Sequence, residues 1–172
     1  MSRFSRTCLV AVLVLGGFAA VTGPAHAATV DQVCVGTWAV TYDPPITTTP
    51  REVHATLTGY FPVCTNPLAP GASYTQAFTD TVSCATLLSA GAASRQYTWS
   101  NPLAAPTTFA YNWTVSDVGG QVVVTNTGLI THGTFSPASA EQVTTLVTAD
   151  FLQCGGTGVS SLTGPTTLTI FH

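Results

Sequence analysis

The sequence predicts an all-β fold: a single antiparallel β-sandwich of about eight strands, Greek-key and immunoglobulin-like, with a small barrel as the alternative. Threonine supplies 29 of the 145 residues from 28 to 172, and its β-branched side chain suits a pleated sheet better than a helix. Polar and apolar residues alternate with a period of two in several segments, as they do in half-buried strands. No stretch of 12 or more residues carries the 3.6-residue apolar period of an amphipathic helix.

Turn-forming clusters divide the chain into strands of ordinary length. Glycine, proline and asparagine residues gather between the alternating segments, where they favour turns. Gly119-Gly120 is the strongest tight-hairpin signal, because both residues tolerate positive φ. Gly128 and Gly133 fall inside one segment, where glycine often marks a bulge. The expected strands are 32–42, 52–61, 73–87, 95–100, 107–116, 120–134, 141–153 and 165–171.

Three of these strands alternate clearly enough to predict which face meets a core and which meets water. The residues expected to share one face are Val53, Ala55, Leu57, Gly59 and Phe61 in the first strand, Phe109, Tyr111, Trp113 and Val115 in the second, and Val143, Thr145, Val147, Ala149 and Phe151 in the third. Because side chains alternate across a strand, each set should pack together against the opposing sheet.

Residues 1–27 have the three parts of an export signal. Two arginines precede an apolar run of 14 residues, which is too short to span about 30 Å of hydrocarbon as a helix. Ala25-His26-Ala27 then places small residues at the two positions that a signal peptidase recognises. We therefore expect cleavage after Ala27, and a secreted, extracellular mature domain at 28–172 without a membrane span.

The net charge of this mature domain limits the classes of partner that it is expected to bind. Two arginines, no lysine and seven acidic residues give a net charge of −5. Nucleic-acid binding requires clustered lysine and arginine, so no nucleic-acid partner is expected. The same scarcity of cations predicts a ligand that is neutral, cationic or proteinaceous rather than one carrying phosphate or sulfate.

Four cysteines remain after removal of the signal, an even number that predicts two disulfides in an oxidising compartment. Their spacings of 30, 20 and 70 residues contain no CxxC, so no metal site is expected. Sequence alone leaves three pairings open. The favoured one joins Cys64 to Cys84, closing a medium loop, and Cys34 to Cys154, tying the first strand to a late one.

The search for catalytic groups nominates no residue and no cofactor. There is no G-x-S-x-G turn for a nucleophilic serine, and His54, His132 and His172 are expected to be exposed. A glycosidase would need two converging carboxylates, which sequence cannot place. Asp80 is the most unusual acid, because it lies between Phe78 and Val82 on an inward-facing pattern. A bulge or one-residue slip that turns it outward is the favoured explanation.

The aromatic residues supply the only nominated ligand site. Tyr97 and Trp99 share one face of a short strand beside a proline-rich loop, and flat exposed rings suit the stacking of sugar rings. Trp38 and Trp113 alternate with apolar residues and are expected in the core.

A set of short motifs runs along nearly the whole mature chain. They are Cys34-Val35-Gly36-Thr37, Tyr42-Asp43-Pro44-Pro45-Ile46-Thr47, Ser83-Cys84, Tyr97-Thr98-Trp99-Ser100, residues 128–135 (GLITHGTF), Leu152-Gln153-Cys154 and Leu162-Thr163-Gly164-Pro165. In order and spacing the chain resembles a group of small exported actinobacterial, Streptomyces-like proteins. The resemblance implies a secreted β-domain with two disulfides, and it carries no catalytic residue to transfer.

Two classes of function follow as hypotheses. The first is a non-enzymatic extracellular binding or structural domain, directed at cell-wall or other polysaccharide or at protein. The alternative is a secreted hydrolase or a protease inhibitor with an unfamiliar site. An inhibitor would present a rigid loop beside a disulfide, for which Thr65–Ala72 is available.

Overall fold

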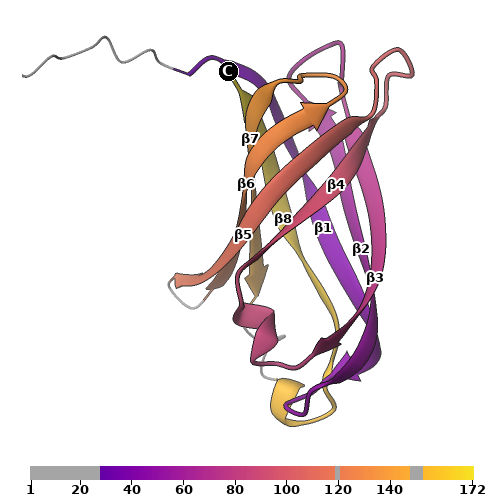
Figure 1. Ribbon diagram of the computed structural model, residues 1–172, viewed down its shortest axis with the longest axis vertical. Helices are drawn as coiled ribbons and strands as arrows, with labels where there is room; N and C mark the ends of the chain where they lie inside the picture. The colour runs from indigo at the N-terminus through magenta and orange to yellow at the C-terminus, as the bar shows by residue number, and fades with distance from the viewer. Residues whose placement is uncertain (1–27, 119–120, 148–152) are drawn as a thin grey trace, which may run out of the picture.

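The computed structural model describes residues 28–118, 121–147 and 153–172, and shows one barrel of eight antiparallel strands (Figure 1). A 3-10 turn, η1, lies between β3 and β4. The elements are β1 (Val30–Ile46), β2 (Arg51–Cys64), β3 (Ala72–Val82), η1 (Thr86–Leu88), β4 (Gly91–Trp99), β5 (Thr107–Val118), β6 (Gln121–His132), β7 (Ala138–Val147) and β8 (Val159–Phe171). Within the described residues, no helix is long and apolar enough to cross a membrane.

The predicted β-sandwich is wrong, because the sheet closes on itself. Each strand pairs with the next one along the chain, and β1 pairs with both β2 and β8. The β1–β8 ladder is long, running from Val30↔Phe171 to Ile46↔Val159. Alternation shows that one face of each strand is buried, and it is the same in a sandwich and a barrel. Closure depends on the pairing of the first strand with the last, for which no local sequence pattern exists.

The eight predicted strands are confirmed in number and order, while several of their ends differ. β1 continues past the expected end at residue 42, through Asp43-Pro44-Pro45, and its register against β8 shifts between Thr41 and Ile46. β3 ends at Val82, five residues before the expected end.

Gly128 keeps an unbroken register with Tyr111 and is not a bulge. Its missing side chain instead allows close approach, since a Cβ there would lie 2.0 Å from the Ala110 carbonyl oxygen. The predicted export signal and the Gly119-Gly120 turn lie outside the described residues.

The predicted faces are confirmed in two strands and reversed in the third. In β2 and β5 the predicted residues face the interior, from Val53 to Phe61 and from Phe109 to Val115. In β7 the interior face carries Gln142, Thr144 and Leu146, whereas Val143 and Thr145 face outward. The reversal is possible because polar side chains on this part of the wall bond one another inside the barrel: Gln142 Nε2 donates to Thr166 Oγ1 at 2.9 Å.

The interior of the barrel has two parts with different packing. The half nearer the C-terminus, which we call the closed half, is filled by aromatic and aliphatic side chains around Phe61, Tyr97, Trp99 and Phe109. The other half, nearer η1, is lined by smaller aliphatic side chains such as Val40, Val53, Leu146 and Leu162. We call it the cavity half, because its side chains leave a cavity unfilled.

The sheet is weakly joined at one place, between β3 and β4. These strands pair at Ala72↔Trp99 and Ser73↔Thr98, in the closed half, and at no other described position. Beyond this point Figure 1 shows them diverging toward the end that carries η1. A side chain bridges the start of the gap, where Gln76 Nε2 donates to the Ser94 carbonyl at 3.3 Å.

The two predicted disulfides are present, but the favoured pairing is wrong. Cys34 bonds Cys64, which is its direct partner in the β1–β2 ladder, and Cys84 bonds Cys154. The first bond therefore joins adjacent strands in the closed half. The second ties the segment that leads into η1 to the segment that follows β7. The disulfide pairing depends on which cysteines the strand register of the barrel brings together, and the sequence alone does not show that register.

Candidate ligand-binding cavity

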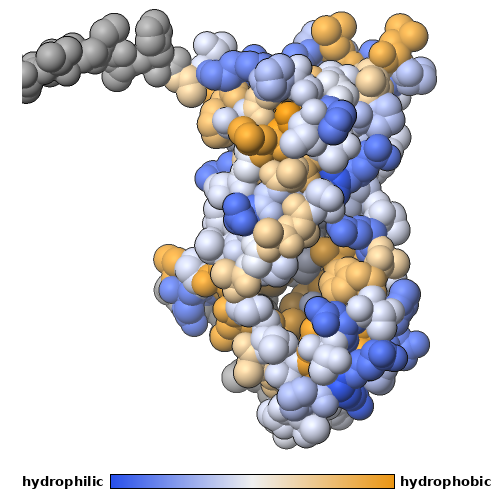
Figure 2. All heavy atoms as spheres, viewed as in Figure 1, coloured by the Kyte–Doolittle hydropathy of each residue, from blue (hydrophilic) through white to orange (hydrophobic). Residues whose placement is uncertain are grey.

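The cavity half encloses a cavity of about 590 Å³ inside the barrel. Its walls are mainly apolar, and Figure 2 shows apolar side chains around a hollow on the face toward the viewer. The principal apolar wall residues are Val40, Ile46, Val53, Ala55, Leu57, Val122, Leu146 and Leu162. The volume lies within the range of about 300–1,000 Å³ typical of small-molecule sites. Barrels of eight strands are just wide enough either to fill with side chains or to hold one small ligand. This barrel is filled with side chains in the closed half and is hollow in the cavity half.

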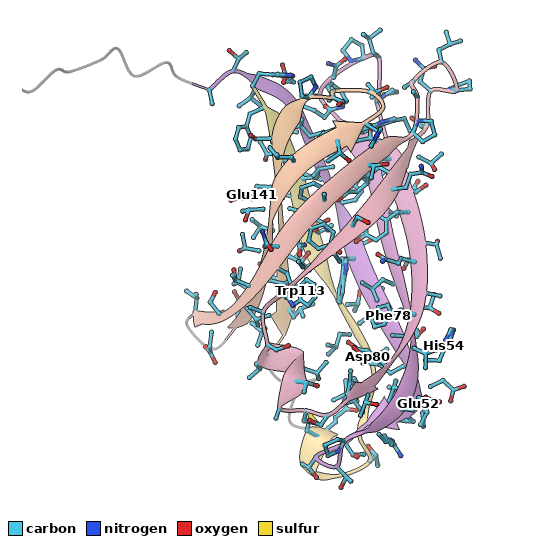
Figure 3. All side chains as sticks on the ribbon, viewed as in Figure 1. Glu52, His54, Phe78, Asp80, Trp113 and Glu141 are labelled. Carbon is cyan, nitrogen blue, oxygen red and sulfur yellow. A yellow bond between two sulfur atoms is a disulfide. The ribbon has the colours of Figure 1, made fainter. Side chains whose placement is uncertain are left out.

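The mouth of the cavity lies at the gap between β3 and β4. Phe78 and Asp80 line it from β3, and Trp113 lines it from β5 (Figure 3). Asp80 pairs with the buried Val53 in an unbroken β2–β3 register, so it keeps its inward direction, and the expected bulge is absent. Asp80 is nevertheless exposed, because β4 has diverged and solvent reaches the inner face of β3 there. A buried carboxylate is therefore avoided without a slip in register.

The segment containing η1 closes the cavity near its mouth. Thr86, Leu87 and Ser89 contribute to the wall, and the Ser89 carbonyl accepts a hydrogen bond from Trp113 Nε1 at 3.2 Å. This segment is held by the Cys84–Cys154 disulfide and by the hydrogen bond from Cys84 N to the Thr47 carbonyl at 2.9 Å. Because η1 has no buried residues of its own, this disulfide and this hydrogen bond hold it in place.

At its inner end the cavity meets a buried arginine. Arg95 projects inward from β4 and is 6% exposed. Its Nη1 donates to Tyr74 Oη and to Gln142 Oε1, the latter at 2.9 Å, and its Nη2 donates to Tyr111 Oη. The guanidinium carbon lies 4.6 Å from the ring centre of Tyr74 and 4.4 Å from that of Tyr111. Cation–π contacts with both rings offset part of the cost of removing the charge from water.

The partners of Arg95 are neutral groups. Gln142 is an amide, and burial raises the pKa of Tyr74 and of Tyr97 above the usual range, although the nearby Arg95 cation lowers both. These hydroxyls therefore stay protonated at neutral pH. His172, directly after β8, contacts the carboxylate of Asp31 near the start of β1. The positive charge of Arg95 is solvated by dipoles and rings, and no described carboxylate is paired with it.

Two buried polar atoms in this part of the wall have no partner among the described residues: Arg95 Nε and Gln76 Oε1. Both residues also line a smaller cleft of about 330 Å³ at the β3–β4 gap. Asn126 and Thr144 are further polar residues of the cavity wall. Because buried polar groups in folded proteins are nearly always hydrogen-bonded, unpaired atoms beside a cavity indicate where a polar group of a ligand or water would bind.

The nominated aromatic platform is wrong, because Tyr97 and Trp99 lie inside the closed half with 0% and 4% exposure. Tyr97 Oη donates to Gln142 Oε1 at 2.7 Å, and Trp99 Nε1 donates to Thr107 Oγ1 at 2.8 Å. Trp38 and Trp113, expected in the core, do face inward but are half-buried and line the cavity. The aromatic rings that a small ligand could touch are thus a different set from the one predicted.

The titratable residues considered for catalysis are dispersed. His54, His132 and His172 are exposed, as expected. Figure 3 shows Glu52 and His54 on the outside of β2, away from Asp80 at the mouth, and Glu141 on another strand, β7. Among the described residues, no group of three or more histidine, cysteine or acidic side chains is placed to hold a metal ion. The loop considered for an inhibitor exposes Leu68, while Gln32 Nε2 binds the carbonyl of the buried Ala69 at 2.8 Å.

Sequence reasoning missed Arg95, although a signal was present. Arg95 alternates with Tyr97 and Trp99, so a single strand pattern places all three side chains on one face. The signal is a charged residue on the same strand face as two aromatic residues. Once the two rings are inside, the same alternation requires the arginine to be inside as well.

Comparisons of the chain with protein-family models, with curated proteins and with solved structures found no match.

Proposed function

We propose that this protein is a secreted, non-enzymatic binding protein that holds one small, largely apolar ligand inside its barrel. The observation that carries the proposal is the cavity of about 590 Å³, which remains in one half of a barrel whose other half is fully packed. Selection for stability alone would favour side chains that fill this space, because unfilled volume in a core costs free energy. Two disulfides in a chain of this size support an oxidising, extracellular location.

The lining explains how an apolar ligand would be retained. Aliphatic side chains from all eight strands supply surface that loses water on binding, at about 25 cal/mol per Å² of apolar area. Trp38 and Trp113 add flat rings beside this surface. Binding of polysaccharide on the outside no longer has nominated residues, since Tyr97 and Trp99 are buried.

A fluorescent apolar probe tests the proposal. N-phenyl-1-naphthylamine, which is neutral and brightens out of water, should bind the oxidised protein with one-to-one stoichiometry and accept excitation energy from Trp38 and Trp113. Ala55→Phe places a ring in the cavity, because Ala55 lines it, and should weaken probe binding at least tenfold. Val124→Phe, from the opposite wall, should act in the same way.

The matched control is Ala77→Phe. Ala77 is exposed on the outer face of β3 and pairs with Thr56, so the same substitution there adds a ring outside the barrel. It should leave the affinity for the probe unchanged, with all variants checked for cooperative unfolding. A wild-type protein that binds no probe, or filled variants that bind as well as Ala77→Phe, would refute the proposal.

A further inference from the structure

From the surroundings of Arg95 we infer that the ligand is an amphiphile whose carboxylate head binds Arg95 at the inner end of the cavity while its apolar body fills the rest. This inference rests on the proposed function and adds the chemical class of the ligand. It also reverses an expectation drawn from net charge, because the charge that a ligand meets is that of the cavity wall rather than that of the whole protein.

Two of the N–H groups of Arg95 have no acceptor among the described residues. A guanidinium carries five N–H groups. The partners among the described residues take two on Nη1 and one on Nη2. The Nε–H and one proton of Nη2 remain, and Nε is buried without a partner. Two adjacent N–H groups on one edge of a guanidinium match the two oxygens of a carboxylate in a bidentate pair.

Charge balance points to the same head group. Removing the charge of an arginine from water is unfavourable, and a buried cation is normally paired with an anion. Here the paired groups are neutral, so a bound carboxylate would supply the missing countercharge in a setting where water screens it little. A neutral alcohol would satisfy one hydrogen bond and leave the charge uncompensated. A cationic head would add a second positive charge to the first.

The two ends of the cavity also orient such a ligand. Arg95 lies at the inner end, and Asp80 lies at the mouth. A carboxylate at the mouth would face the like charge of Asp80, whereas one at the inner end meets Arg95. The apolar body then contacts the aliphatic wall around Val53, Leu146 and Leu162.

Three probes of equal chain length test the inference by calorimetry at pH 7: decanoate, decanol and decylamine. The wild-type protein should bind decanoate at least tenfold more tightly than decanol, and decylamine most weakly. Arg95→Gln should bring decanoate down to the affinity of decanol. Arg95→Lys, which keeps the charge but loses the two-donor edge, should retain only part of the preference.

The chain offers a matched control in Arg51, the other arginine of the described residues. Its Nε is also unpaired, but its Nη2 donates to the Pro45 carbonyl and it does not line the cavity. Arg51→Gln should preserve the preference for decanoate. If Arg95→Gln does not fold, the wild-type ranking decides alone.

The possible failures are distinguishable. Equal or tighter binding of decanol by the wild-type protein, or an equal loss of preference in Arg51→Gln, would overturn the carboxylate inference and leave the cavity as an apolar site. Absence of binding by all three probes and by N-phenyl-1-naphthylamine would instead refute the proposed function.

Discussion

The two halves of this barrel are built from the same eight strands, but their interiors are packed differently. In the closed half β3 and β4 are paired, and rings such as Tyr97 and Phe61 meet edge to face with centroids 6.0 Å apart. In the cavity half the same two strands diverge, and shorter aliphatic side chains make up most of the wall, with Trp38 and Trp113 beside them. The closed half therefore forms a packed core, whereas the cavity half leaves volume unfilled. Arg95 lies where the two halves meet.

Truncating a ring should expose the largest difference between the halves. Trp99→Ala removes a side chain that is 4% exposed and should lower the free energy of unfolding by about 3–5 kcal/mol. Trp113→Ala removes a half-buried ring at the cavity mouth and should cost clearly less. Urea unfolding measures both. Equal losses would show that the cavity half is packed as tightly as the closed half.

Removing each disulfide separates stability from binding. Replacing either pair of cysteines by serine should cost about 2–4 kcal/mol, since each bond restricts the unfolded chain. Only the loss of Cys84–Cys154 should also weaken binding of N-phenyl-1-naphthylamine, because that bond holds the η1 segment against the cavity. Loss of Cys34–Cys64 acts in the closed half and serves as the control. A similar loss of probe binding in both variants would contradict the assignment of η1 to the cavity wall.

Adding a ring should also cost more stability in the closed half than in the cavity half. Ala140→Phe inserts bulk at a position that is 1% exposed in the closed half, where overpacking costs about 1–3 kcal/mol. Ala55→Phe places the same bulk into empty volume and should change stability by less than about 1 kcal/mol. Thermal and urea unfolding of the two variants decide the matter. A larger loss for Ala55→Phe would mean that the cavity cannot accept a ring.

Alkaline pH should affect both halves in the same direction. Burial raises the pKa of Tyr97 in the closed half and of Tyr42 in the cavity half, so both stay neutral in the folded protein above pH 10. The unfolded chain ionises there, and stability that is complete below pH 10 is lost as the pH rises. Each residue contributes a slope of up to about 1.4 kcal/mol per pH unit.

The variants Tyr97→Phe and Tyr42→Phe isolate these contributions. Each substitution should make the fall of the unfolding free energy between pH 10 and 11.5 less steep, by up to about 1.4 kcal/mol per pH unit. A slope that persists in Tyr42→Phe alone would indicate that the cavity half keeps its tyrosine hydrated.

Much of the secondary structure could be predicted from the sequence, and the site could not. The alternation in β2 and β5 predicted the inward faces because both strands carry apolar residues on one side only. The same rule failed in β7, where Gln142 and Thr144 point inward to meet Thr166 and Arg95. A polar network is recognised as interior only when its partners are known, and those partners come from other strands.

The sequence by itself determined an all-β chain of eight strands, four cysteines able to form two disulfides, and a strand on which Arg95, Tyr97 and Trp99 share a face. These are local properties, set by side-chain branching, by alternation and by turn residues. Tertiary structure alone decided that β1 meets β8, that Cys34 meets Cys64, and that β3 parts from β4 to leave a cavity beside Arg95. Each of these depends on which strands become neighbours, and strand pairing is a property of the whole closed sheet rather than of any segment within it.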